Sequence, residues 1–314
     1  MILQSRNITK LYTNHLALDD ISVDVPRGSI YGLLGPNGAG KTTFIRIINR
    51  ITMPDSGQVI FNGEPLSSKH ITKIGYMPEE RGLYKKMKVG EQVLFFAQLK
   101  GLSYSEAIQK IKPWFEKLKI TSWWNMKVEE LSKGMAQKIQ FIITVLHQPE
   151  LLIFDEPFSG FDPVNANIIK NEILSLRDKG TTIIFSTHNM NSVEEICDHI
   201  TLINKSKNIL SGNIADIKRT YSQGEYKIDY NGDTDRLIDV LTPLCTIKSQ
   251  SNLSTNALQS IVILGNDKDK RDLIRVVNET VEIKHLSEQV PSMNEIFLKM
   301  VGSSNTEPNS IITE

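Results

Sequence analysis

The segment from Gly35 to Thr43 constrains the fold of this chain more than any other part of the sequence. It fits the pattern G-x-x-x-x-G-K-[ST], whose glycines turn backbone N–H groups inward to cradle a phosphate. The apolar stretch 29–34 before it predicts a buried strand, and residues 44–49 after it have helical spacing. This order places an anion at a helix N-terminus, where the helix dipole favours it. The sequence therefore predicts a phosphate-binding loop made of Gly35, Pro36, Asn37, Gly38, Ala39, Gly40, Lys41, Thr42 and Thr43.

Two side chains of this loop, and two acids far from it, suit a nucleoside triphosphate. Lys41 can reach the β- and γ-phosphates, and Thr42 can offer its hydroxyl to Mg²⁺. An apolar strand, residues 151–156, ends in Asp155 and Glu156. We expect Asp155 to hold Mg²⁺ through water and Glu156 to polarise the water that attacks the phosphate.

Further short sequence motifs occur in a definite order before, between and after these two. Tyr12 precedes the loop, and Leu131–Met135 opens a helix ahead of the acidic strand. Ser159–Pro163 follows the acids, and Ser186–His188 follows the next apolar strand. In this order the motifs resemble those of an ATP-binding-cassette (ABC) ATPase, and the resemblance covers residues 2 to about 220.

The resemblance implies roles for residues outside the phosphate loop. Tyr12 is expected to stack on the adenine ring of ATP. Ser132 and Gly134 match the signature motif, which in this family closes on the γ-phosphate bound by a second subunit. Ser132 is also expected to cap the N-terminus of the helix that follows it. Asp162 is expected to link the two sites, and His188 to contact the γ-phosphate and hold the attacking water. The family resemblance thus implies ATP and Mg²⁺ as cofactors and a homodimer or heterodimer of ATPase subunits.

The sequence departs from the family pattern at two places. The signature usually contains Gly-Gly-Gln, and this chain has Lys133, Gly134 and Met135. The loop after the first core segment usually carries a glutamine, and this chain has Glu79. A carboxylate can still ligate Mg²⁺ through oxygen, so we expect Glu79 to join Thr42 and Asp155 as a metal ligand. It also adds a negative charge near the phosphates.

The composition is that of an ordinary globular protein, and the charge balance gives no reason to expect nucleic acid as a partner. The 314 residues carry 36 basic and 36 acidic side chains, so no net charge favours nucleic acid. Cys197 and Cys245 form no metal pattern and suit a reducing cytosol. No apolar run approaches the roughly 20 residues that span a bilayer. We therefore expect a location on the cytoplasmic side of the plasma membrane, reached through an integral-membrane permease.

Shifts in pattern predict the domain organisation. We expect an α/β ABC ATPase core at residues 1–220, with an inserted helical subdomain at about 87–147. Residues 221–302 alternate strand and helix and predict a small C-terminal α+β unit of ferredoxin-like type, with a regulatory, assembly or purely structural role. The predicted strands lie at 226–230, 257–265 and 281–285, and the predicted helices lie at 233–244, 268–280 and 291–301. A polar tail at 303–314 predicts disorder.

Three classes of ABC protein compete for this chain. A soluble translation ATPase usually carries two cassettes, and a DNA-repair ATPase carries a long coiled coil between the loop and the signature. This chain has one phosphate loop, and only a short segment separates that loop from the signature. Both features favour the third class, the ATPase subunit of a membrane transporter. The run 78–84 and the C-terminal unit look most like ATPases of bacterial export systems, including sodium-efflux and drug-export pumps. The segment 79–87 is the candidate contact with the permease.

Overall fold

The computed structural model describes residues 1–80, 82–254, 257–265 and 267–303. The chain divides into two compact units, Met1–Ile214 and Ala215–Glu314. The boundary predicted at residue 220 lies inside helix α7 (Ile214–Tyr221), which begins at this division. Of the tail predicted at 303–314, residues 304–314 lie outside the described part, and Ser303 ends helix α10 (Met293–Ser303).

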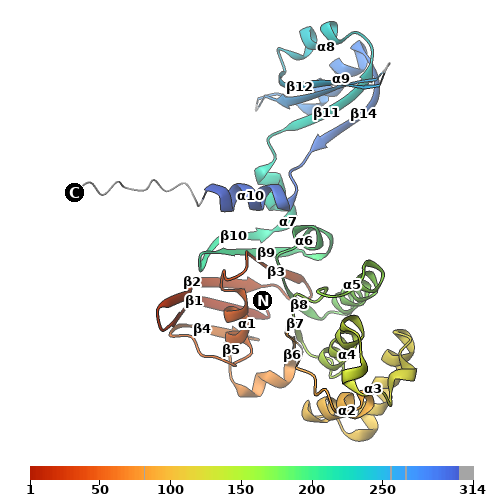
Figure 1. The fold of residues 1–314 in the computed structure, drawn as a ribbon. Helices are drawn as coiled ribbons and strands as arrows, with labels where there is room; N and C mark the ends of the chain where they lie inside the picture. Colours follow the sequence, from red (N-terminus) through yellow and green to blue (C-terminus); the bar gives the residue numbers. More distant parts are fainter. Residues whose placement is uncertain (81, 255–256, 266, 304–314) are drawn as a thin grey trace, which may run out of the picture. The chain divides into compact units, whose positions relative to one another are not determined.

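A six-stranded sheet forms the centre of the first unit (Figure 1). Its strand order is β10-β9-β3-β8-β7-β6, and all neighbours are parallel except β9 and β10. Every residue of β3, β7 and β8 is buried, as expected for parallel strands covered on both faces. The strands are β3 (Ile30–Leu34), β6 (Ile74–Met77), β7 (Leu151–Asp155), β8 (Thr182–Thr187), β9 (His199–Asn204) and β10 (Lys207–Asn213).

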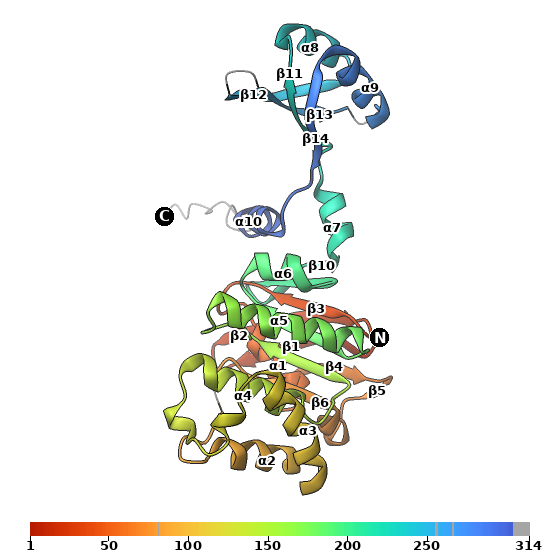
Figure 2. The same cartoon turned by 90° about the vertical axis from the view of Figure 1, so that its right-hand side faces the viewer.

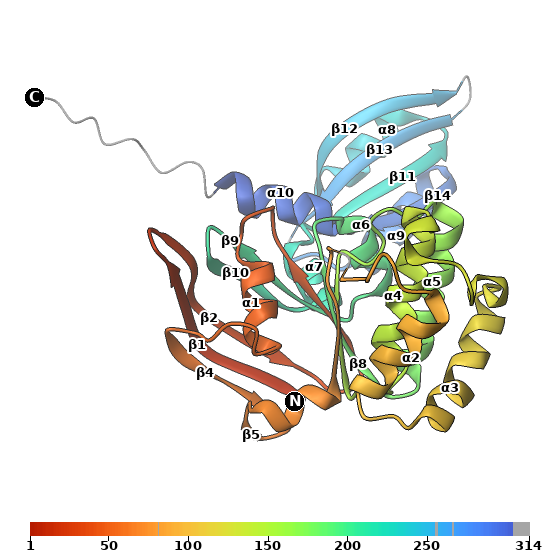
Figure 3. The same ribbon diagram turned by 60° about the horizontal axis from the view of Figure 1, so that its bottom comes forward.

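A second, antiparallel sheet of order β2-β1-β4-β5 packs over helix α1 (Lys41–Ile48). Figure 3 shows α1 between the two sheets, and apolar side chains from both sheets and from α1 share one core. The apolar residues of α1 are buried, whereas Thr42 and Arg46 are exposed. The strands are β1 (Leu3–Tyr12), β2 (His15–Val25), β4 (Ser56–Phe61) and β5 (Glu64–Pro65).

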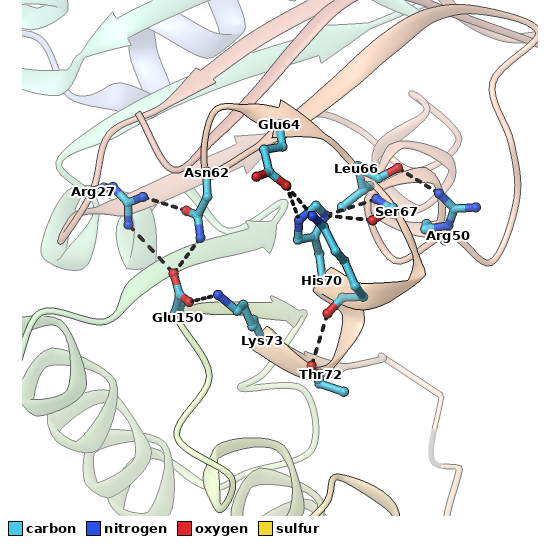
Figure 4. A network of polar contacts seen from close by, with 11 residues as sticks. Arg27, Arg50, Asn62, Glu64, Leu66, Ser67, His70, Thr72, Lys73 and Glu150 are labelled. Carbon is cyan, nitrogen blue, oxygen red and sulfur yellow. Dashed lines mark hydrogen bonds and ion pairs between the residues drawn. The ribbon is translucent and has the colours of Figure 1, made fainter.

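A polar network joins the two sheets at the amino end of β7 (Figure 4). The Glu150 carboxylate lies 2.9 Å from Nζ of Lys73 and accepts a 2.7 Å hydrogen bond from Nδ2 of Asn62. Arg27 donates to the Asn62 side chain at 2.6 Å. The Glu150 backbone N–H donates to the Lys73 carbonyl at 2.9 Å. Glu150 therefore connects the β4–β5 turn, the short helix η1 (Ser68–Lys73) and the start of β7.

A cluster of helices between β6 and β7 has a core of its own, which groups side chains from Val89 to Leu146 (Figure 2). These helices fall within the range 87–147 expected for the inserted subdomain. They are α2 (Val89–Leu99), α3 (Tyr104–Lys117), α4 (Lys133–Val145) and the short 3₁₀ helices η2 (Thr121–Trp123) and η3 (Val128–Glu130). Two more helices, α5 (Pro163–Asp178) and α6 (Met190–Ile196), follow β7 and β8.

The second unit contains a four-stranded antiparallel sheet of order β12-β13-β11-β14 with two helices, α8 and α9. Its core groups apolar side chains of all four strands and both helices. The sequence reading missed β12, because that strand carries few apolar residues and its register shifts twice against β13. The elements are β11 (Glu225–Asn231), α8 (Thr234–Leu241), β12 (Cys245–Ser254), β13 (Ala257–Leu264), α9 (Lys270–Thr280) and β14 (Glu282–Gln289).

Helices long and apolar enough to traverse a bilayer are absent from the described part of the chain.

Candidate active site

The phosphate loop joins β3 to α1 and packs its backbone directly against neighbouring strands. Gly35 has a φ of 147° and Gly40 a φ of 114°, where other residues are strained. A Cβ at Gly35 would collide with the carbonyl oxygen of Ile203 in β9, and one at Gly40 with that of Ala17 in β2. These two glycines are therefore required by the packing of the loop as well as by its curvature.

Lys41 is the first residue of α1, and its side chain folds back over the loop. Its Nζ donates hydrogen bonds to the carbonyl oxygens of Gly35 at 2.7 Å and Pro36 at 3.1 Å. Burial lowers the pKa of Lys41, and the carboxylates of Glu156, Asp155 and Glu79 act in the opposite direction. A buried ammonium close to the loop amides suits the β- and γ-phosphates of a nucleotide.

Asp155 ends β7 and is almost fully buried, at 3% exposure. Burial raises its pKa, and the nearby carboxylates of Glu156 and Glu79 raise it further. The hydroxyl-bearing Thr42 lines the same cavity as Asp155 and Glu79. In the described part of the chain, no three His, Cys, Asp or Glu side chains converge as a complete metal-binding group.

Glu156 follows directly and has an unusual backbone, with a φ of 48°. Its Oε2 accepts a hydrogen bond from the Thr187 hydroxyl at 3.0 Å, and its Oε1 accepts one from the His188 backbone N–H at 2.9 Å. Nδ1 of His188 lies 2.6 Å from the same Oε1. The carboxyl ends of β7 and β8 are adjacent, because these strands pair in parallel, and this brings Glu156 and His188 together. The sequence indicated none of these three contacts of Glu156.

The predicted residues from the loop, the acidic strand and the first hairpin meet in a cavity of about 320 Å³. Two further lining residues, His15 and Ala17, were not predicted, because they follow a hairpin turn and carry no recognisable motif. Gly35, Pro36, Ala39 and His188 are not among the lining residues, although Lys41 and Glu156 contact three of them. The lining residues are Tyr12, His15, Ala17, Asn37, Gly38, Gly40, Lys41, Thr42, Thr43, Glu79, Asp155 and Glu156.

Ser132, Gly134 and Asp162 are not among the residues that line this cavity. Gly134 instead faces Gly160 and Phe161, the two residues before Asp162. Ser132 caps α4, and its hydroxyl accepts a hydrogen bond from the Met135 N–H at 3.3 Å. Asp162 caps α5 by accepting hydrogen bonds from Val164 and Asn165, both at 3.0 Å. The N-cap expected at Ser132 is therefore confirmed.

Comparison with known proteins agrees with this arrangement of motifs. A family model described as ABC transporter matches residues 18–159. A second model, described as ATP-binding protein DrrA1-3-like, C-terminal domain, matches residues 212–301. The chain is 38% identical over 297 residues to the uncharacterized ABC transporter ATP-binding protein YhaQ of Bacillus subtilis, covering 95% of this chain and 97% of the relative.

It is 29% identical over 304 residues to the Nod factor export ATP-binding protein I of Cupriavidus metallidurans, covering 96% and 97% of the two chains. A solved ATP-binding subunit of an ABC transporter superposes with a TM-score of 0.66 at 29% identity, covering 70% of this chain and 93% of that one. The first unit thus has the ABC ATPase α/β fold, and an additional C-terminal unit of antiparallel sheet and helices follows it. The chain belongs to the family of ABC transporter ATP-binding proteins.

Proposed function

We propose that this chain is the ATP-hydrolysing subunit of an export system and drives substrate through a separate membrane permease. The observation that carries the proposal is the cavity in which the phosphate loop, Asp155 and Glu156 meet. The similarity to a Nod factor export protein over nearly the whole chain supports export rather than import. A sodium-efflux or drug-export role belongs to the same class, in which the permease recognises the cargo.

The residues of the cavity suit ATP. Tyr12 is 39% exposed at the end of β1, and Nζ of Lys10 lies 5.4 Å from the centre of its ring. An exposed aromatic ring at the mouth of the cavity offers a face on which adenine can stack. Lys41 and the amides from Gly38 to Thr43 would then hold the phosphates.

The oxygen atoms of Thr42, Glu79 and Asp155 suit Mg²⁺, which commonly takes one or two carboxylates and completes its shell with water and nucleotide phosphates. The raised pKa of Asp155 fits this assignment, because a bound cation would relieve the repulsion among the neighbouring carboxylates. When bound, Mg²⁺ supplies charge neutralisation at the phosphates.

Glu156 would orient and polarise the attacking water. Its carboxylate is held by Thr187 and His188, so its position is set before substrate arrives. His188 is 63% exposed in its side chain and can turn between Glu156 and a γ-phosphate. Holding the base in advance reduces the reorganisation needed in the transition state.

Gly134 supports a site that is shared with a second copy. It lies in the first turn of α4, and glycine is a weaker helix former than alanine. A Cβ at this position would meet only ordinary contacts, the nearest 3.5 Å away on Phe161. The packing of the chain therefore does not require glycine here. A phosphate bound by another ATPase subunit could approach closely only if residue 134 is glycine. The exposed Ser132 would offer its hydroxyl to the same phosphate. Asp162, which follows the Phe161 that Gly134 faces, would then lie near the same junction.

The permease is expected to contact the segment 79–87. Glu79, Glu80 and Gly82 line a hollow of about 660 Å³ together with the exposed Ile51. Tyr84 is 55% exposed, and its ring lies 6.0 Å from that of Phe95. Apolar side chains next to the nucleotide cavity suit a protein contact that reports nucleotide state. We therefore propose a location at the cytoplasmic face of the plasma membrane, with no role in binding nucleic acid.

We also propose that residues 1–220 and 221–302 act as an ATPase domain and an accessory domain of ferredoxin-like topology. The order β11-α8-β12-β13-α9-β14 and the sheet order β12-β13-β11-β14 support this topology. The nucleotide cavity is built from residues of the ATPase domain, which favours a regulatory or assembly role for the accessory domain. A translation or DNA-repair ATPase remains the alternative class, and the match of the C-terminal unit to a DrrA-type domain weighs against it.

The shared site can be tested by sizing the Glu156→Gln protein with and without MgATP. Loss of the catalytic carboxylate should slow hydrolysis by at least about 10²-fold and trap an ATP-bound dimer. Gly134→Asp, added to this variant, puts a Cβ and a negative charge where phosphate must approach, so it should abolish the dimer and leave ATP binding to the monomer nearly intact. Gly302→Asp, in the open surroundings of α10, is the matched control. An ATP-dependent dimer that survives Gly134→Asp would contradict the shared site.

A further inference from the structure

Lys133 is a cation that this chain has in place of the usual signature glycine. It is the first residue of α4, directly after the cap Ser132, and its side chain is exposed. Its stem, from Cγ to Cε, covers Gly160 so closely that a Cβ on Gly160 would collide with it. Gly160 has a φ of 87° and lies in the loop between Glu156 and α5. The stem of the Lys133 side chain therefore lies along a surface loop.

The ammonium of Lys133 has no partner within the described part of its own chain. No hydrogen bond or ion pair engages it there, whereas Lys117 pairs with Glu172 and Lys127 with Glu129. Lys133 is also absent from the residues that line its own nucleotide cavity. An ammonium with no partner among the described residues of its chain can engage an incoming anion without first breaking an ion pair.

The nucleotide cavity, in contrast, carries an excess of negative charge. Lys41 shares it with the carboxyl groups of Glu79, Asp155 and Glu156. Bound ATP adds several more negative charges, of which Mg²⁺ offsets two. Glu79 contributes one negative charge that the usual glutamine would not. A further cation would therefore reduce the electrostatic repulsion most if it lay beside the phosphates.

We propose that Lys133 projects into the nucleotide site of a second copy of this chain, where its ammonium faces the phosphates and offsets the charge of Glu79. The inference rests on the proposed shared site: Lys133 stands between Ser132 and Gly134, so it arrives wherever these two residues approach a phosphate. A compact ammonium on a flexible stem binds phosphate as a point charge. In a two-fold dimer each copy places its cation in the anionic cavity of the other, so the charge complementarity occurs twice.

The test measures assembly rather than activity. Sedimentation velocity of the full chain carrying Glu156→Gln, with MgATP, gives the apparent dissociation constant of the dimer. Adding Lys133→Gln should raise this constant at least about tenfold, and Lys133→Arg should restore most of the loss. Lys112→Gln removes the same charge from an exposed position on α3 and should have no effect. The loss should shrink as salt rises from about 0.05 M to 0.5 M, because salt screens the attraction.

A double-mutant cycle with Glu79→Gln isolates the link between the two residues. With glutamine at 79, the penalty of Lys133→Gln should fall to less than about threefold, because the charge to be offset is gone. An equal penalty with either residue at 79 would overturn the link to Glu79. A Lys133→Gln protein that dimerises like its parent at every salt concentration would overturn the whole inference. If the Glu156→Gln parent stays monomeric with MgATP, the shared site itself fails, which is a different result from a dimer that ignores Lys133.

Discussion

At the scale of single residues, Lys41 combines burial, loop contacts and nearby carboxylates in one side chain. Its Nζ bonds to two carbonyl oxygens of the loop, and it is 7% exposed. We expect Lys41→Ala to weaken ATP binding at least about tenfold, because one charge-assisted contact to the β- and γ-phosphates is lost. The fold should persist, since the remaining core of α1 is apolar. A nucleotide titration followed by fluorescence, with far-ultraviolet circular dichroism to check the fold, measures both effects. Lys112→Ala is the control, and unchanged affinity in Lys41→Ala would mean that the loop is not the phosphate site.

At the scale of elements, the Glu150 network holds β7 in place at the end opposite the acids (Figure 4). The hydrogen bond from Lys73 is the main cause that lowers the pKa of Glu150, helped by Asn62 and opposed by burial. The stability that this carboxylate contributes is therefore fully present above its ordinary value of 4.5 and is lost as pH falls through the lower folded pKa. We expect Glu150→Gln to lower the free energy of unfolding by roughly 0.5–1 kcal/mol at neutral pH, because the side chain is partly exposed. Urea unfolding at pH 7 and at a pH well below 4.5 should show the two proteins converging as pH falls through the folded pKa of Glu150. Glu116→Gln on α3 is the control, and a pH-independent difference would contradict this account.

At the scale of the whole molecule, the nucleotide cavity is built from residues between Tyr12 and Glu156 of the first unit. The second unit has its own core, built from four strands and two helices. A chain that ends at Ile214 should therefore bind ATP within about twofold of the full chain, because each unit has what a domain needs to fold alone. Isothermal titration calorimetry of both proteins measures this, and their unfolding curves show whether the shorter chain is folded. A loss of more than tenfold in affinity, in a shorter chain that remains folded, would show that the C-terminal unit contributes to the nucleotide site.

The sequence predicted those features whose cause is local. The phosphate loop, the buried strand before it and the cap at Ser132 depend on residues within a few positions of one another, and the structure places them as expected. The apolar strand that ends in Asp155 is equally local, since burial on both faces requires an unbroken apolar run. Strand β12 escaped prediction for the opposite reason: it is a polar edge strand that exists through pairing with β13.

Tertiary structure alone decided which side chains meet. Glu156 and His188 are brought into contact by the parallel pairing of β7 and β8, and His15 reaches the cavity only because β1 and β2 form a hairpin. Likewise, Lys133 lies over Gly160 because α4 packs beside the loop that follows β7. The sequence by itself determined which chemical groups this protein has available, because the local backbone conformation and the charge of each motif depend on residues within that motif. The fold decided which of those groups act together, because contacts between distant segments depend on strand order and packing that no short stretch of sequence contains.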